Sequence, residues 1–472
     1  MKRFHSNRRQ GNIRLKSHRT LWMWVIVTLI MSSITLTSFS NIVHAKETKK
    51  PNIVFILSDD HRWNHMGFMD HPWIQTPNMD RMAKEGIVFN NAFCTTSLCS
   101  PSRASFVTGQ YAHKHGVTNN ITPWNNKNVT VLELMKKGGY KTAFIGKWHM
   151  PGHLPELRGV DRFITFTAKT GQGQYFDCPL IIDGVETQRK GKYIGKDLTD
   201  FAIEFINKEK DNTFCLYLAH KAPHGPFKPP PELKNFYEDK NIDHLPKWAH
   251  RYAGMCDGGI YGGVLWNVEA QYKRYCSLIT SLDQQVGRVI DELERLGIAD
   301  NTIVIYSTDN GYFFGDKGHF DKRWAYEPDL RIPFIVKYPA GIKDPGNRSD
   351  KMILNVDLAP TLLDLAGISV PAYMDGKSIL PILEGQSITL REDFHYEFFK
   401  DFPPYTVPGI DAVRTNEFLY IEYNESRMKP ELYNILKDPG NIHNLMETPE
   451  GAKVLPGLKI QLEEYKRRKR HG

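Results

Sequence analysis

The chain has 472 residues, of which 41% are hydrophobic and 24% charged, an ordinary globular composition with ample length for a large core. It contains no internal repeat and no long low-complexity tract, and six cysteines in this length exclude a disulfide-dense scaffold. The formal net charge is +8, but seven basic residues and no acidic one precede residue 20. Without them the charge is 8 minus 7, about +1, so we expect no nucleic-acid partner.

Residues 1–45 have the pattern of a signal peptide. The basic segment leads into the apolar run "LWMWVIVTLIM", and "IVHAK" places Val43 and Ala45 in the small-x-small pattern of a cleavage site. The run is short for a spanning helix, although an uncleaved anchor is the alternative. We therefore expect an exported protein, periplasmic or secreted, with no membrane segment beyond this one.

Four short apolar runs predict buried strands, each followed by a polar cluster. Amphipathic patterns between them predict helices, several of which end in glycine. Alternation of strands and helices predicts an α/β fold with a large, mostly parallel sheet flanked by helices. The strands are expected at 52–58, 140–146, 213–219 and 301–307, and the helices at 78–86, 130–139, 196–210 and 272–297.

The pattern changes after about residue 380, where short strands joined by turns precede a terminal helix expected at 457–470. We predict a catalytic domain over residues 46–385 and a smaller α+β domain over residues 386–472. The basic end "YKRRKRHG" is interpreted as a solvated helix end rather than a polyanion-binding patch.

The stretch "SLCSPSRASFVTGQY" places Cys99 just before a helix that starts near Pro101 and stops at Gly109. Free N–H groups at such a helix start favour negative charge, and Arg103 is positioned to reach back toward the cysteine. These residues alone leave two interpretations open. Cys99 is either a reactive thiol with a lowered pKa or a buried cysteine at a helix cap.

Oxygen donors follow two of the predicted strands, in the pairs Asp59-Asp60 and Asp309-Asn310. Ligands in parallel sheets bind beyond the carboxyl ends of the strands, so these pairs are expected to meet at one site. Together they suit Ca²⁺ or Mg²⁺ better than a soft metal. Taken alone, Asp59-Asp60 is also consistent with a turn at a strand end, and Asp309-Asn310 is better explained by a β-turn.

The motif "CSPSRASFVTG" resembles the sulfatase signature, C-x-P-S-R followed by T-G. Other motifs of that family occur in the same order along residues 50–385. The resemblance implies an alkaline-phosphatase-like fold and hydrolysis of sulfate esters. The additional matching motifs are "SDDHRW", "GKWH", "APHGPF", "STDNG" and "GHFDKRWAYEPDLRIPFIVKYP".

The resemblance also implies that Cys99 is oxidised to formylglycine (3-oxoalanine), whose hydrate attacks sulfur. It implies a partner enzyme, of the formylglycine-generating or sulfatase-maturing kind. A single cation, Ca²⁺ rather than Mg²⁺, is expected to orient the nucleophile. Its implied ligands are Asp59, Asp60, Asp309, Asn310 and the modified Cys99, and the implied catalytic residues beside Cys99 are Arg103, Lys147, His149, His224 and Lys322.

The expected substrate is a sulfated carbohydrate, by the resemblance to exported sulfatases. The aromatic and glycine-rich segment 247–267 is a candidate sugar pocket through His250 and Arg251, or else an ordinary packed loop. His319 is a further candidate for substrate binding. Two alternatives remain: a phosphonate or phosphodiester hydrolase of the same superfamily, and a non-catalytic binder of sulfated glycans.

Overall fold

The computed structural model describes residues 50–150, 159–166, 172–247, 267–401 and 407–471. Its main feature is a ten-stranded sheet in the order β13-β2-β12-β9-β1-β8-β4-β5-β6-β7. The central strands β9, β1, β8, β4 and β5 are mutually parallel, and both flanks contain antiparallel pairs. Their bounds are β1 Asn52–Asp59, β2 Ile87–Phe89, β4 Lys141–Gly146, β5 Arg162–Phe166, β6 Leu180–Ile182, β7 Val185–Thr187, β8 Phe214–Pro223, β9 Thr302–Thr308, β12 Phe334–Lys337 and β13 Arg348–Ser349.

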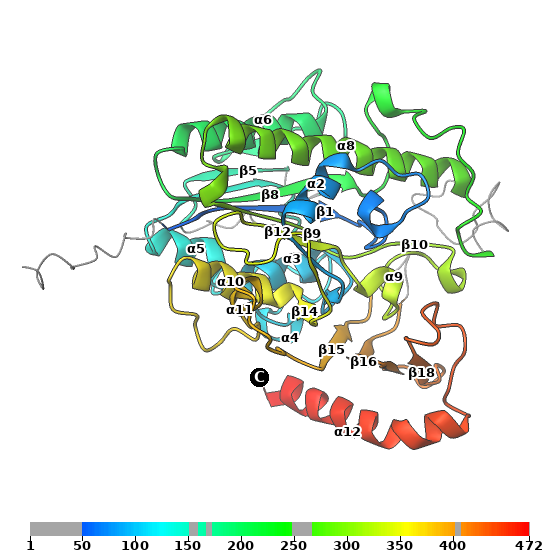
Figure 1. Cartoon of the computed structure of the whole chain (residues 1–472). Helices are drawn as coiled ribbons and strands as arrows, with labels where there is room; N and C mark the ends of the chain where they lie inside the picture. The colour runs from blue at the N-terminus through cyan, green and yellow to red at the C-terminus, as the bar shows by residue number, and fades with distance from the viewer. Residues whose placement is uncertain (1–49, 151–158, 167–171, 248–266, 402–406, 472) are drawn as a thin grey trace, which may run out of the picture. The chain divides into compact units, whose positions relative to one another are not determined.

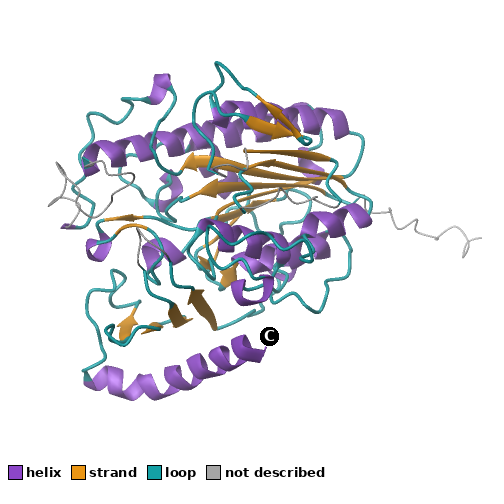
Figure 2. Cartoon of the chain, turned by 180° about the vertical axis from the view of Figure 1, so that it is seen from behind, coloured by secondary structure: helices purple, strands orange, loops and turns teal. Residues whose placement is uncertain are grey.

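Helices cover both faces of this sheet, as Figures 1 and 2 show. Alternate residues of β1 point to opposite faces, so Val54 packs in one hydrophobic cluster and Phe55 in the other. The first cluster contains side chains of α2 (Pro77–Glu85), α6 (Ile194–Glu209) and α8 (Val268–Arg295). The second contains side chains of α3 (Cys99–Thr108), α5 (Val131–Lys137) and α10 (Leu358–Leu365). Burial on both faces explains why the central strands are nearly continuous apolar runs.

The four predicted strands and the four predicted helices are all confirmed within a few residues. The helix ends were predictable because their capping signals are local in the sequence. The Thr130 side chain caps α5 by accepting the N–H of Glu133, and Asn267 caps α8 by accepting the N–H of Ala270. The helices are α2 Pro77–Glu85, α3 Cys99–Thr108, α4 Ala112–His115, α5 Val131–Lys137, α6 Ile194–Glu209, α8 Val268–Arg295, α9 Glu327–Leu330, α10 Leu358–Leu365 and α11 Leu380–Leu383.

Two small sheets lie outside the large one. The parallel pair β3 (Ala92–Phe93) and β14 (Ile353–Leu354) precedes α3 and α10 along the chain. The antiparallel pair β10 (Phe313–Phe314) and β11 (Phe320–Asp321) follows the end of β9. The first pair joins the chain before Cys99 to residues 353–354, and the second lies between Asn310 and Lys322.

A separate four-stranded antiparallel sheet confirms the smaller C-terminal α+β region. The terminal helix α12 (Pro449–His471) starts eight residues earlier than expected and continues through Pro456. The four strands are β15 Asp393–Phe398, β16 Ile410–Thr415, β17 Phe418–Tyr423 and β18 Glu431–Asn434. The domain boundary between residues 385 and 386 stays a prediction.

The basic end of α12 is not simply solvated, which corrects our expectation. The Lys469 Nζ donates to Asp411 Oδ1 at 3.0 Å and lies 3.4 Å from Glu397 Oε2. Both carboxylates lie on the small sheet, and Glu397 also accepts a hydrogen bond from His113 of α4 at 3.0 Å. One buried carboxylate thus links the terminal helix to the large domain.

The cysteines form no disulfide among the described residues. Cys215 is buried in β8, as predicted for a core thiol. Cys256 and the predicted signal peptide, residues 1–45, lie outside the described residues. Within the described ranges, no helix combines the length and the apolar character needed to cross a membrane.

Replacing Gly146 by alanine is expected to destabilise the protein by about 1–3 kcal/mol. Gly146 ends β4 with φ +117°, and an added Cβ would lie 1.8 Å from the carbonyl oxygen of Ala219 on β8. Gly184→Ala is the control, since its φ is +89° but no heavy atom lies within 4 Å of the new Cβ. Urea unfolding measures both free energies. Equal losses would show that the contact with Ala219 carries no cost.

Candidate active site

The predicted meeting of strand ends is confirmed by direct contacts. Lys147, which follows β4, donates from Nζ to Asp59 Oδ2 at the end of β1 at 2.6 Å. The backbone N–H of Asp60 donates to Asp309 Oδ1 at 3.0 Å. His224 follows β8, and its Nε2 lies 3.6 Å from Asp60 Oδ2. Four strands therefore contribute to one polar cluster at the carboxyl edge of the parallel sheet.

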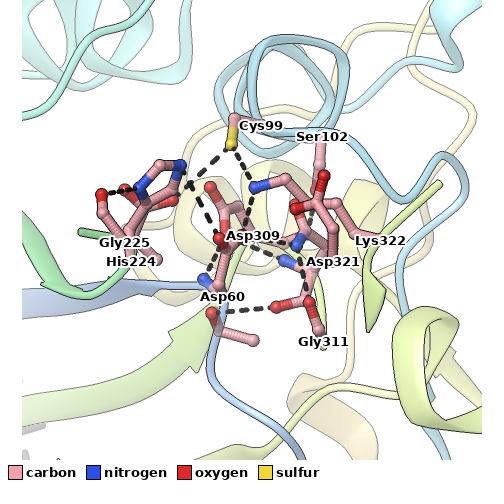
Figure 3. Close-up of polar contacts among 12 residues, drawn as sticks. Asp60, Cys99, Ser102, His224, Gly225, Asp309, Gly311, Asp321 and Lys322 are labelled. Carbon is pink, nitrogen blue, oxygen red and sulfur yellow. Dashed lines mark hydrogen bonds and ion pairs between the residues drawn. The ribbon is translucent and has the colours of Figure 1, made fainter. Parts of the chain in front are cut away.

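Cys99 is the first residue of α3, so the helix starts one or two residues earlier than the local motif predicted. The helix ends at Gly109, whose φ of 68° is left-handed and whose N–H donates to Ser105 O. At the other end, Asn120 Oδ1 accepts the N–H of Ser100 at 3.0 Å, which satisfies one unpaired donor of the helix start. The helix thus presents Cys99 to the polar cluster (Figure 3).

The sulfur of Cys99 lies among charged groups and is fully buried. It is 3.0 Å from Lys322 Nζ, 3.7 Å from Lys147 Nζ and 3.6 Å from Asp59 Oδ1. Burial raises the pKa of the thiol to about 12, against the lowering effect of Lys147 and Lys322. The interpretation as a thiol with a lowered pKa is therefore wrong, because desolvation outweighs the helix start and the two lysines.

Arg103 is near enough to Cys99 for their charges to interact, but its hydrogen bonds are made to other groups. Its guanidinium lies 2.8 Å from Asp309 Oδ2 and 3.4 Å from Asp59 Oδ1, and it donates to Lys147 O at 2.9 Å. One side chain of α3 therefore ties together the ends of β1, β4 and β9. Bidentate guanidinium geometry suits this bridging role better than a lysine would.

Three carboxylates and three cations share this water-excluded site. Burial raises the pKa of Asp60 to about 7, with a further rise from Asp59 and Asp309, despite Lys322. Burial also raises the pKa of Asp309. Although burial alone would raise it, Lys147, His224, Arg103 and Lys322 hold the pKa of Asp59 well below its usual range. The three carboxyl groups thus differ in pKa, which is lowered for Asp59 and raised for Asp60 and Asp309.

The oxygen donors fit a hard divalent cation. Asp60 Oδ2 and Asn310 Oδ1 are buried and have no hydrogen-bond partner among the described residues. Asn310 instead donates from Nδ2 to Asp60 Oδ1 at 2.8 Å, so its oxygen remains available. Ligand atoms of Asp59, Asp60, Cys99 and His224 lie within 4.8 Å of one another. Two buried oxygens without donors are the feature that a cation would satisfy.

His224 is held in one tautomer by its surroundings. Its Nδ1 lies 2.6 Å from the carbonyl oxygen of Gly225, which only accepts, so Nδ1 carries the proton. The Tyr175 hydroxyl donates to His224 O at 2.6 Å and steadies the same turn. Burial lowers the pKa of His224 well below its usual value.

His149 and an unexpected neighbour, Gln172, lie beside Lys147. Gln172 Oε1 accepts from Lys147 Nζ at 2.9 Å, and its Nε2 is 2.8 Å from His149 Nε2. Burial lowers the pKa of His149 well below its usual value, with Lys147 adding to the effect. Sequence reasoning missed Gln172, because an isolated glutamine in a loop carries no motif or periodicity.

Lys322 lies between two residues with left-handed backbone, Asp321 at φ 70° and Arg323 at φ 96°. Asp329 Oδ2 accepts the N–H of Arg323 at 2.6 Å and of Trp324 at 2.8 Å, which fixes the turn that presents the lysine. Nζ of Lys322 also contacts Asp60 Oδ1. Non-glycine residues in this backbone region persist where surrounding contacts hold them, often at active sites.

Of the three predicted substrate-binding residues, the structure describes only His319. His319 lies three residues before Lys322, and its ring packs 4.6 Å from that of Trp324 and 5.8 Å from that of Tyr326. Burial lowers the pKa of His319 to about 4. The structure thus places it in an aromatic group beside the site. His250 and Arg251 lie outside the described residues.

Relatives of known activity resemble this chain over most of its length. It is 32% identical to an N-acetylglucosamine-6-O-sulfatase of Bacteroides thetaiotaomicron, over 92% of this chain and 89% of the relative. It is 28% identical to the N-acetylglucosamine-6-sulfatase of Homo sapiens, over 86% of this chain and 82% of the relative.

Two solved structures resemble this chain over most of its length. A protein solved with its substrate, D-glucosamine-2-N,6-O-disulfate, superposes with a TM-score of 0.82 at 30% identity, covering 90% of this chain and 99% of that one. Phosphonate monoester hydrolase of Agrobacterium radiobacter shares the fold at 21% identity, with a TM-score of 0.73 and coverage of 89% and 96%.

Two families match the sequence itself. Residues 315–468 match the C-terminal region of N-sulphoglucosamine sulphohydrolase. Residues 51–368 match the sulfatase family and include every described residue of the site. The chain therefore belongs to the sulfatase family and is a sulfuric ester hydrolase.

Proposed function

We propose that the enzyme removes sulfate esters from carbohydrate, with a formylglycine made from Cys99 as nucleophile. The observation that carries this proposal is the position of Cys99. It starts α3 with its side chain fully buried between the ammonium groups of Lys147 and Lys322. A thiol with a pKa near 12 is a poor nucleophile there, whereas a hydrated aldehyde supplies hydroxyl oxygens in the same place.

Hydrolysis of the sulfate ester by this route consumes only water. One hydroxyl of the hydrated aldehyde forms a bond to sulfur while the bond from sulfur to the alcohol oxygen breaks. The alcohol leaves with a proton, and the sulfate remains attached to the residue. Loss of the proton from the second hydroxyl reforms the C=O bond and expels sulfate. Water then hydrates the aldehyde again.

The charged residues have separable roles in this proposal. Lys147 and Lys322 stabilise negative charge on the attacking oxygen and on the sulfate, since both ammonium groups face the Cys99 side chain. Arg103 neutralises and positions Asp309 and Asp59. His224 and Lys322 contact the sulfate and the leaving oxygen. Lys322 protonates that oxygen, because neutral His224 keeps its proton on Nδ1. His149 interacts with the hydrated aldehyde.

Asp59, Asp60, Asp309, Asn310 and the oxidised Cys99 would hold one Ca²⁺, which orients the nucleophile and polarises the sulfate. The oxygens of Asp60 and Asn310 that have no protein donor support this assignment. A larger, more flexible coordination shell favours Ca²⁺ over Mg²⁺ for a set of carboxylate and amide oxygens.

The proposed substrate is glucosamine sulfated at O6, within a glycosaminoglycan or similar sulfated saccharide. Support comes from the named activities of the relatives and from the C-terminal match to a sulphoglucosamine enzyme. His319, and His250 and Arg251 outside the described residues, are the proposed sugar-binding side chains. Export through residues 1–45 and maturation by a formylglycine-generating enzyme complete the proposal, with a catalytic domain over 46–385 and a smaller domain over 386–472.

Replacing Cys99 by alanine is expected to lower kcat at least ~10³-fold, because the nucleophile is lost. Protein coproduced with a maturation enzyme is assayed on sulfate and phosphate esters of one aryl alcohol, after mass spectrometry confirms the aldehyde. Cys94→Ala is the matched control, a buried thiol five residues earlier whose removal leaves the nucleophile in place.

Full activity of Cys99→Ala would refute the nucleophile. Faster turnover of the phosphate diester would favour the phosphodiesterase alternative. Glycan binding without hydrolysis by any matured form would favour the non-catalytic binder.

Ca²⁺ is expected to raise the free energy of unfolding by about 2.7 kcal/mol at a concentration of one hundred times its Kd. Asp60→Asn removes a charged ligand and is expected to abolish this gain, whereas the exposed Asp239→Asn keeps it. Urea unfolding with Ca²⁺, Mg²⁺ or chelator provides the measurement. Equal stabilisation of wild type and Asp60→Asn would place the cation elsewhere.

Matured enzyme is expected to show at least about tenfold higher kcat/KM on 6-O-sulfated N-acetylglucosamine than on 4-O-sulfated N-acetylgalactosamine, a difference of roughly 1.4 kcal/mol in transition-state binding. Sulfate release from both monosaccharides is measured under the same conditions. A preference for the 4-O-sulfate would overturn the proposed sugar while leaving sulfatase activity intact.

A further inference from the structure

Gln172 makes two hydrogen bonds that together determine the orientation of its amide. A lysine ammonium only donates, so the amide atom 2.9 Å from Lys147 Nζ is the oxygen, Oε1. The amide nitrogen therefore faces His149 Nε2, at 2.8 Å. An amide nitrogen only donates, so His149 Nε2 must accept. The donor and acceptor chemistry of the two partners therefore determines the orientation of the amide.

The tautomer of His149 follows from this contact. A neutral imidazole carries one proton, and with Nε2 as acceptor that proton is on Nδ1. Nδ1 of His149 is buried and has no hydrogen-bond partner among the residues that the structure describes. A buried N–H donor without a partner costs free energy, so a ligand oxygen at this position would be favoured.

The ring is also held from its backbone. Ser100, the residue after Cys99, donates from Oγ to the carbonyl oxygen of His149 at 2.5 Å. His149 has a left-handed backbone with φ 57°, and its side chain is nearly buried. The start of α3 therefore restrains the backbone of His149, and Gln172 restrains its ring at Nε2.

We propose that Gln172 is a positioning residue that keeps His149 in the Nδ1-protonated form, as a hydrogen-bond donor to an oxygen of the sulfate or of the hydrated aldehyde. This rests on the proposed function of the site. Gly225 holds His224 in the same tautomer, but there Nε2 is the atom nearest to Asp60. The two imidazoles thus present opposite atoms, a donor from His149 and an acceptor from neutral His224.

The tautomer is measured directly by nitrogen NMR of full-length protein with labelled histidine, with Cys99 unmodified. The His149 signals are identified by their loss in His149→Gln. We expect a protonated Nδ1 and a bare Nε2 in the wild type. Gln172→Glu keeps an acceptor for Lys147 but turns an acceptor toward His149, so Nε2 is expected to become protonated. The exposed Gln386→Glu is the matched control and is expected to leave the signals unchanged.

Kinetics of the matured variants separate positioning from binding. Gln172→Glu and Gln172→Leu are expected to lower kcat about 10- to 100-fold with little change in KM, because the donor at Nδ1 acts on the reacting oxygens. Gln172→Leu also removes the bond to Lys147, which Gln172→Glu retains, so a loss shared by both variants is attributed to His149.

Two results would overturn the proposal. One is a protonated Nε2 in the wild type, and the other is an unchanged tautomer together with full kcat in Gln172→Glu. Either result with wild-type sulfate release leaves the proposed function standing. An absence of sulfate release from matured protein with the expected tautomer would count against the proposed function alone.

Discussion

The structure depends on placing three carboxylates and three cations together out of water. Asp59, Asp60 and Asp309 are fully buried, and Arg103, Lys147 and Lys322 are at most 2% exposed. Each charge would be costly to bury alone, and each is tolerated because an opposite charge lies within hydrogen-bond distance. Removing one partner leaves the others uncompensated, so these residues act as a unit. The site is consequently preorganised for an anion before any substrate arrives.

A rigid scaffold is needed to hold such a cluster, and the central strands provide it. Residues of β1 alternate between two hydrophobic clusters, which leaves Asp59 at its end little freedom to move. Where a strand must turn sharply into the site, the backbone adopts left-handed conformations, at Asp60 with φ 68° and at His149 with φ 57°. These conformations cost free energy locally and are maintained by the packed sheet behind them.

The small C-terminal sheet supports the segment that precedes Cys99. Its Tyr396 hydroxyl lies 2.5 Å from Ser97 Oγ, and the N–H of Glu397 donates to Thr95 O at 3.0 Å. Leu98 and Tyr396 belong to one buried hydrophobic cluster. The segment that leads to Cys99 therefore packs against the small sheet. This explains why a region far along the chain belongs with the catalytic residues.

Sequence alone determined the strands, the main helices and the approach of the Asp59-Asp60 and Asp309-Asn310 pairs, because hydrophobic periodicity and helix caps are local signals. It also determined the family, since the Cys99 motif and its companions occur in order. Only the tertiary structure decided the state of Cys99, whose pKa depends on desolvation by distant segments. The partner of Arg103 and the role of Gln172 were likewise decided in three dimensions, because each depends on contacts between residues far apart in the chain.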